Sequence, residues 1–239
     1  MKDIFINKRT WQTFTEAEMN EYIQKVFNYY RKNGFPYFKS DKTFRDKEFL
    51  KTKKYDFKNV IDKENKIIKQ TMHGLSLAWS YMPHSWEIVC GNKKTPFEVF
   101  HNDELFIKVI EKRIKMGDNI SDNGIRKMLK LFTGTQSVSN FRPTAAAAIY
   151  SLFCKEGDTV WDFSSGFGGR LIGAELAKVN YIGTDPSTLT YNGLIKLKKD
   201  YIKSIKSEIH KSGSEEFKPK EKSIDFIFTS PRSIINNQI

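Results

Sequence analysis

Apolar positions in the first half of the chain recur every three to four residues, which is the spacing of amphipathic helices. Residues 15–33 place Tyr22, Val26 and Tyr29 on one face, and Thr15 with Glu18 forms a capping-box pattern at the start. Two further helices are expected, over residues 103–116 and 122–132. We therefore expect residues 1–137 to form a mostly helical N-terminal domain.

The pattern changes near residue 138, where short apolar runs begin to alternate with helical stretches. Strands are expected at TVWDF, NYIGTD and SIDFIFTS, and helices are expected to start at Pro143, Arg170 and Thr190, with the last one running to His210. Strands that alternate with helices are typical of a parallel sheet covered by helices. The sequence therefore predicts an α/β domain over residues 138–239.

A loop of small residues, the glycine loop of residues 164–169, joins the first expected strand to its helix. Its glycines allow a tight turn and a close approach to a ligand, and open parallel sheets bind ligands at this edge. Asp185 ends the next strand, 19 residues after Gly166, where a carboxylate can accept both hydroxyls of a ribose. Because Leu171 breaks the GxGxxG spacing and no Gly-Lys-Ser/Thr follows, the loop favours a phosphate-free adenosine ligand over a dinucleotide.

The stretch VWDFSSGFGGRLIGAELAKVNYIGTDPS resembles motifs I and II of the phage and bacterial DNA amino-methyltransferases, and the preceding Phe-Arg-Pro resembles their F-x-P element. The resemblance covers roughly residues 138–232. It implies a partial Rossmann-like methyltransferase sheet, S-adenosylmethionine as cofactor, and adenine N6 or cytosine N4 as the methylated atom. It also implies that the cofactor contacts Phe141, Pro143, Asp162, Ser164, Gly166, Gly168, Gly169, Asp185, Pro186 and Ser187.

By the same resemblance, Asp185 would hold the ribose, Pro186 and Ser187 would border the adenine, and the glycines with Asp162 would surround the methionine part. The family's catalytic strand ends in Asp/Asn/Ser-Pro-Pro-Tyr/Phe, whose aromatic ring stacks on the flipped base. The matching residues here, and hence the implied catalytic ones, are Ser230 and Pro231.

The catalytic element departs from the family pattern, because Arg232 and Ser233 replace its second proline and its aromatic residue. Loss of the stacking ring would cost about 1–3 kcal/mol, or about 10- to 100-fold in rate. Only 6 residues follow Ser233, whereas a complete domain of this family continues for several more strands and helices. We therefore expect methyl transfer to be impaired. We also expect the last strand to be an apolar edge, so that a second chain covers it, the N-terminal domain covers it, or the chain is a fragment.

The net charge of the chain favours a nucleic-acid partner. Lys and Arg number 40 against 28 Asp and Glu, a net charge of +12, which favours nucleic acid although a solvated lysine-rich surface gives the same count. Residues 1–70 hold 17 of the basic and 10 of the acidic side chains, with aromatic residues between the lysines. Such a segment suits base stacking and phosphate contacts, and the alternative is that Phe44, Phe49 and Phe57 are core residues.

Other residue types exclude several classes of site. The two cysteines lie far apart and the four histidines form no ligand motif, so no metal site or disulfide is expected. The N-terminus is charged where a signal peptide is apolar, and no stretch approaches the ~20 apolar residues of a membrane helix. We expect a cytoplasmic protein with no membrane partner.

Three functions remain open at this stage. The first is a DNA amino-methyltransferase-like protein that binds S-adenosylmethionine and nucleic acid, with DNA favoured over RNA. The second is a non-catalytic, phage-derived protein that binds nucleic acid or a nucleoprotein, for example a counter-defence inhibitor of a host nuclease or of an RNA-guided effector. The third is an RNA methyltransferase, because amino-methylating enzymes share the catalytic tetrapeptide.

Overall fold

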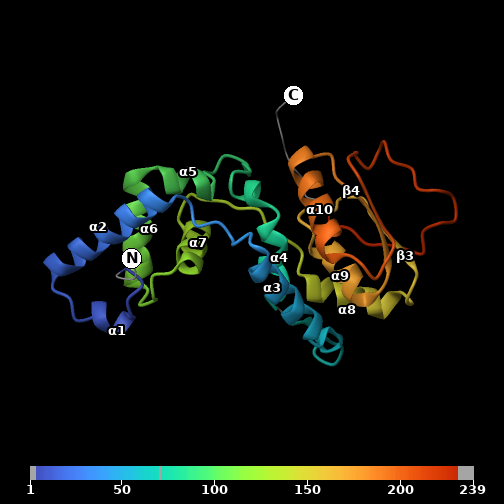
Figure 1. Ribbon diagram of the computed structural model, residues 1–239, viewed down its shortest axis with the longest axis horizontal. Helices are drawn as coiled ribbons and strands as arrows, with labels where there is room; N and C mark the ends of the chain where they lie inside the picture. The colour runs from blue at the N-terminus through green and yellow to red at the C-terminus, as the bar shows by residue number, and fades with distance from the viewer. Residues whose placement is uncertain (1–3, 70, 231–239) are drawn as a thin grey trace. The chain divides into compact units, whose positions relative to one another are not determined.

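The computed structural model of this chain describes residues 4–69 and 71–230 (Figure 1). These residues form two compact units. The helical unit comprises the described residues up to Tyr37 together with His84–Val138, and the sheet unit comprises Phe38–Pro83 and the described residues from Ser139 onward. The expected boundary near residue 138 coincides with one border between the units, whereas Phe38–Pro83 groups with the sheet and not with the other N-terminal residues.

The helical unit contains the helices that the periodicity indicated. Thr15 and Glu18 form the expected capping box at the start of the long second helix, because each side chain accepts a hydrogen bond from the other residue's backbone N–H. Aromatic rings fill the interior, where Tyr30 meets Phe106 edge-on at 5.8 Å between ring centroids. The helices of this unit are α1 (Lys8–Trp11), α2 (Glu16–Asn33), α5 (Pro96–His101), α6 (Asp103–Lys115) and α7 (Asp122–Leu131), and a 3-10 turn at Pro83–Trp86 leads into its second part.

The lysine-rich segment at the start of the sheet unit contains a helix, α3 (Lys42–Lys54), that the sequence pattern did not indicate. Phe49 packs against Tyr201 with ring centroids 4.9 Å apart, and Phe57 packs against a small buried cluster around Val60. Both rings are therefore half-buried and packed within the sheet unit. The remaining elements of the segment are a 3-10 turn (Phe57–Val60), β1 (Ile61–Asp62), β2 (Ile67–Ile68) and α4 (Leu75–Ser80).

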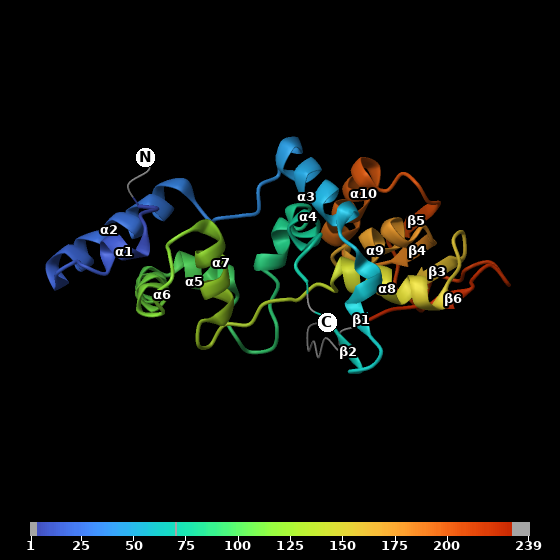
Figure 2. The same ribbon diagram turned by 90° about the horizontal axis from the view of Figure 1, so that it is seen from below.

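A four-stranded parallel sheet confirms the α/β class that the sequence predicted. Its strands lie in the order β5-β4-β3-β6, one beside the next in Figure 2. Both views place the three helices of this region together on one side of the strands. The strands are β3 (Thr159–Asp162), β4 (Asn180–Thr184), β5 (Ser207–His210) and β6 (Phe226–Ile227), and the helices are α8 (Pro143–Phe153), α9 (Gly169–Ala177) and α10 (Thr188–Tyr201).

One expectation for this region was wrong. The helix expected to run to His210 ends at Tyr201, and Ser207–His210 is instead strand β5, paired in parallel with β4. The turn between α10 and β5 is fixed by a residue that is distant in the sequence. The carboxylate of Glu175 on α9 accepts the backbone N–H groups of Lys203 and Ser204. No local signal in the sequence marks that contact.

The two faces of the sheet are covered unequally. Val160 and Tyr181 point to the helix-covered face and are buried, whereas their neighbours Trp161 and Ile182 point the other way and are only half-buried. Ile227 on β6 is 52% exposed. Among the described strands β6 pairs only with β3, so the last strand is an edge of the sheet, as expected.

Candidate functional site

The glycine loop lies where the topology of the sheet creates room for a ligand. It follows β3, whose next strand along the chain, β4, lies on one side while β6 lies on the other. In open parallel sheets ligands bind outside the carboxyl ends of the strands, at the point where the strand order reverses. The glycine loop, Asp185 after β4 and Ser230 after β6 all follow carboxyl ends of neighbouring parallel strands, so they share that edge.

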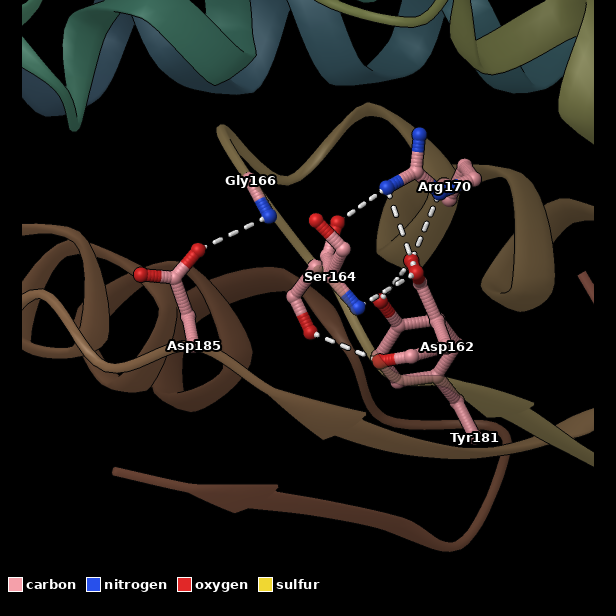
Figure 3. Close-up of polar contacts among 7 residues, drawn as sticks. Asp162, Ser164, Gly166, Arg170, Tyr181 and Asp185 are labelled. Carbon is pink, nitrogen blue, oxygen red and sulfur yellow. Dashed lines mark hydrogen bonds and ion pairs between the residues drawn. The ribbon is translucent and has the colours of Figure 1, made fainter. Parts of the chain in front are cut away.

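Below the loop lies a buried ion pair between the last residue of β3 and the first turn of α9. Arg170 Nε donates to Asp162 Oδ2 at 2.6 Å and its Nη2 donates to Asp162 Oδ1 at 3.2 Å (Figure 3). The Tyr181 hydroxyl donates to the same carboxylate at 2.6 Å, and the Ser164 N–H also donates to it. The side chain of Asp162 is 0% exposed and that of Arg170 is 5% exposed, so this network is sealed from solvent.

The network fixes the course of the glycine loop. Arg170 donates a further hydrogen bond to the Ser164 carbonyl, so one guanidinium joins the strand end, the loop and the helix. Burial lowers the pKa of Arg170, but the carboxylate of Asp162 outweighs it and the net pKa is raised. Burial and the same carboxylate raise the pKa of Tyr181, so its hydroxyl stays a donor. The Asp162 side chain thus supports the loop from inside and does not face the open edge.

Asp185 faces the glycine loop from the neighbouring strand. Its Oδ2 accepts the Gly166 N–H at 3.1 Å (Figure 3). Its Oδ1 accepts the Ser187 N–H at 3.0 Å. Burial raises the pKa of Asp185, and the two N–H donors act against that rise. Each carboxylate oxygen has a second lone pair, so Asp185 can accept two more hydrogen bonds from a bound molecule.

Gly166 leaves open space at this point. Its φ is +55°, in the left-handed region that glycine adopts without strain. A Cβ at this position would meet no atom nearer than the Ser164 carbonyl oxygen at 3.8 Å. The structure therefore leaves room beside the Gly166 backbone.

The other two glycines of the loop serve packing. A Cβ at Gly168 would lie 2.7 Å from Leu197 of α10, and a Cβ at Gly169 would overlap the carbonyl oxygen of Phe141. Gly168 and Gly169 are both buried. They let α9 and its first turn approach α10 and the segment before α8, so they shape the loop without being open to a ligand themselves.

The F-x-P segment lies against the glycine loop. Asn140 donates from Nδ2 to the Phe167 carbonyl at 3.0 Å, and the Phe141 ring lies 5.6 Å from the Arg170 guanidinium. Phe141 also meets Phe228, which directly follows β6, edge-on at 5.3 Å. Pro143 is buried in the first turn of α8. The structure therefore brings together three separate stretches that the sequence singled out: the F-x-P segment, the glycine loop and the end of β6.

The remaining expected residues lie at the rim of the same edge. Pro186 and Ser187 are exposed, and the Ser187 hydroxyl accepts the Thr190 N–H as the cap of α10. Ser230 is exposed two residues after Phe228. Pro231 lies outside the described residues.

Three side chains of the site were missed in the sequence, namely Asn140, Arg170 and Tyr181. Arg170 directly follows the glycine loop at the start of an expected helix, eight residues after Asp162, so the opposite charges across the turn were a usable signal. Tyr181 occupies a strand position that looks like an ordinary apolar one. Its role appears only once β3 and β4 are paired, with Asp162 opposite Gly183.

Neither a metal cluster nor a membrane-spanning helix is found among the described residues. No three His, Cys, Asp or Glu side chains there come together as a metal would require. Over the same part of the chain, no helix has the length and apolarity needed to cross a membrane. Comparison with known proteins found no match for this chain among protein-family models, curated proteins or solved structures.

Proposed function

We propose that the sheet unit binds S-adenosylmethionine at the carboxyl edge of its sheet, and that the chain is a DNA amino-methyltransferase-like protein. The observation that carries the proposal is the 3.1 Å hydrogen bond from the Gly166 N–H to the Asp185 carboxylate. This hydrogen bond holds the open turn at Gly166 beside the half-buried Asp185 carboxylate, which can still accept further hydrogen bonds. Adenosine ligands need that pairing of a ribose acceptor with an approachable backbone.

The strand order supports a Rossmann-like methyltransferase sheet. Counted along the chain, β5-β4-β3-β6 is the order third, second, first, fourth. Doubly wound nucleotide-binding sheets share this order, and their ligand sits beyond the first strand at the switch point. The glycine loop occupies that position here.

The residues present fit the cofactor. Asp185 would accept the ribose hydroxyls, Gly166 would leave room for the methionine part, and Pro186 with Ser187 would border the adenine. The buried Asp162–Arg170 pair would keep the loop in place before the ligand arrives, which limits the ordering cost of binding. When bound, S-adenosylmethionine supplies an electrophilic methyl group for transfer to a nucleophilic nitrogen.

Methyl transfer to adenine N6 or cytosine N4 of DNA is the proposed reaction, at a reduced rate. Ser230 is exposed beyond β6, close in sequence to the Phe228 ring that contacts Phe141. No aromatic residue follows Pro231 to stack on a flipped base, since Arg232 and Ser233 occupy the next positions. Incorporation of tritiated methyl groups into duplex DNA measures the reaction, and a Ser230→Ala variant is its control. Incorporation that is equal for both proteins would contradict a role of Ser230.

A non-catalytic nucleic-acid- or nucleoprotein-binding protein is the second candidate, favoured by the same Ser-Pro-Arg-Ser sequence. A long cation at Arg232 suits contact with a phosphate better than a compact base-holding turn. The two candidates differ in the tritium experiment. Cofactor binding without incorporation into DNA or RNA favours the second.

Calorimetric titration with S-adenosylmethionine tests the cofactor proposal. Asp185→Asn removes the charge that accepts the ribose hydroxyls, and we expect affinity to fall by about 10- to 100-fold, since charge-assisted hydrogen bonds contribute about 1.5–3 kcal/mol. Asp225→Asn is the matched control, because Asp225 also accepts a backbone N–H, that of Thr159 at 2.8 Å, but precedes β6 and so lies at the opposite edge of the sheet. Equal affinities of the two variants for S-adenosylmethionine would refute the assignment of Asp185 as the ribose-binding residue.

A further inference from the structure

Helix α3 carries the largest surplus of positive charge among the described helices. Its sequence KTFRDKEFLKTKK contains six basic and two acidic residues. Both acidic side chains are already engaged, Asp46 with Lys42 and with the Tyr201 hydroxyl, and Glu48 with Lys51. Among the described residues, no carboxylate lies within ion-pairing distance of Lys47 or Lys54.

Three of the six basic residues of α3 share one face. Lys47, Lys51 and Lys54 follow the i, i+4, i+7 spacing of a single helical stripe and are all exposed. With Thr43, Asp46 and Leu50 they line one open hollow of the surface. The Asp46 carboxylate there is paired with Lys42. At 1.5 Å per residue the three lysines span about 10 Å along the helix, which equals about three steps between successive phosphates of one DNA strand, at about 3.4 Å of duplex axis per step.

The opposite face of α3 anchors the stripe to the sheet unit. Arg45 donates to the Ser80 hydroxyl at 3.0 Å and to the Ser80 carbonyl at 2.7 Å, and its guanidinium lies 3.7 Å over the Tyr81 ring. Phe49 packs against Tyr201, the last residue of α10. The helix that begins directly after Asp185–Ser187 therefore holds α3 at its other end. The lysine stripe is thus displayed by a helix fixed within the same unit as the glycine loop.

We propose that the outer face of α3, formed by Lys47, Lys51 and Lys54, binds the sugar-phosphate backbone of duplex DNA. Lysine ammonium groups are point charges that neutralise phosphates without reading sequence, so this face would set the position of the duplex and not the target base. The exposed Leu50 between the lysines, 54% exposed, suits contact with the apolar side of a deoxyribose. The choice of DNA as the polyanion rests on the proposed function, whereas the location of the surface rests on α3 alone.

The test is the salt dependence of binding to a fluorescent DNA duplex of about 20 base pairs, followed by anisotropy. Each phosphate contact contributes about 0.9 to the slope of log K against log salt. The triple variant Lys47→Gln, Lys51→Gln, Lys54→Gln should therefore lower the slope by about 1.8 to 2.7, the smaller value applying where Lys51 keeps its ion pair with Glu48. The matched control is Lys108→Gln, Lys112→Gln, Lys115→Gln on α6, which has the same spacing and charge change but lies among Asp103, Glu104 and Glu111.

A control slope equal to that of the unmodified chain, with a reduced slope for the α3 variant, supports the inference. An α3 variant with an unchanged slope overturns it, as do an equal loss in both variants or a chain that binds no duplex. Stronger binding of an RNA duplex of the same sequence would overturn the choice of DNA. Titration of the unmodified chain and the α3 variant with S-adenosylmethionine separates the two proposals. If the α3 variant changes DNA binding but neither protein binds the cofactor, the DNA-binding role of α3 is supported and the proposed function is refuted.

Discussion

Replacing Arg170 with methionine is the most informative perturbation of the candidate site. Methionine keeps much of the side-chain length but removes the two hydrogen bonds to Asp162 and the one to the Ser164 carbonyl. The Asp162 carboxylate then remains buried, with the Tyr181 hydroxyl and the Ser164 N–H as its other donors.

The expected loss of stability follows from burial. With the two side chains 0% and 5% exposed, solvent does not screen the pair, and removal of one partner of such a pair costs about 3–5 kcal/mol. At a urea dependence of about 2–3 kcal/mol per molar, the unfolding midpoint of the sheet unit should fall by about 1–2 M. Adding Asp162→Asn to Arg170→Met removes the orphaned charge, so the double variant should regain at least about 2 kcal/mol.

Urea unfolding followed by circular dichroism measures these differences. Glu156→Gln is the control, because Glu156 forms an ion pair with Lys178 whose side chains are 71% and 58% exposed, and such surface pairs contribute less than about 1 kcal/mol. If Arg170→Met costs no more than Glu156→Gln, or if the losses of Arg170→Met and Asp162→Asn simply add, the buried pair does not hold the glycine loop and the reasoning fails.

Three further predictions concern other parts of the chain. Gly169→Ala should destabilise the sheet unit by about 1–3 kcal/mol because its Cβ overlaps the Phe141 carbonyl, whereas Gly166→Ala, which meets only open space, should cost about 1 kcal/mol and weaken cofactor binding; urea unfolding and calorimetry separate the two. Because burial raises the pKa of Asp185, cofactor affinity should fall on acidification at a higher pH than an ordinary aspartate would give, and the Asp185→Asn variant should not show this fall. Burial and the charge of Arg126 lower the pKa of Lys130 to about 8, so between pH 8 and about 10 the unfolded chain binds a proton that the folded chain has released. The free energy of unfolding should therefore rise with pH in that window, and pH-dependent urea unfolding of Lys130→Met should lose the rise.

Local signals in the sequence were sufficient for much of the fold. The capping box of Thr15 and Glu18 starts α2 as expected, because both partners lie within one helical turn. The alternation after residue 138 indicated the parallel sheet, since buried parallel strands read as short apolar runs. In contrast, β5 was taken for helix because its identity depends on pairing with β4 and on Glu175, contacts that are distant along the chain.

The candidate site could also be predicted only in part from the sequence. The positions of Gly166 and Asp185 followed from the lengths of a strand, a turn and a helix, which fix the spacing between consecutive strand ends. The support provided by Arg170 and Tyr181 depends on their burial in the folded chain, which spacing does not reveal. The grouping of Phe38–Pro83 with the sheet unit also rests on long-range contacts, such as the hydrogen bond from the Tyr201 hydroxyl to Asp46, 155 residues away.

A crystal structure of the chain grown with S-adenosylmethionine tests the central claim most directly. We expect the cofactor at the carboxyl edge of the sheet, with both ribose hydroxyls donating to the Asp185 carboxylate and the methionine part over Gly166. The Asp162–Arg170 pair should be unchanged, because it is complete before any ligand binds. Cofactor density elsewhere on the chain, or none at saturating concentration, would contradict the assignment of this edge as a cofactor site.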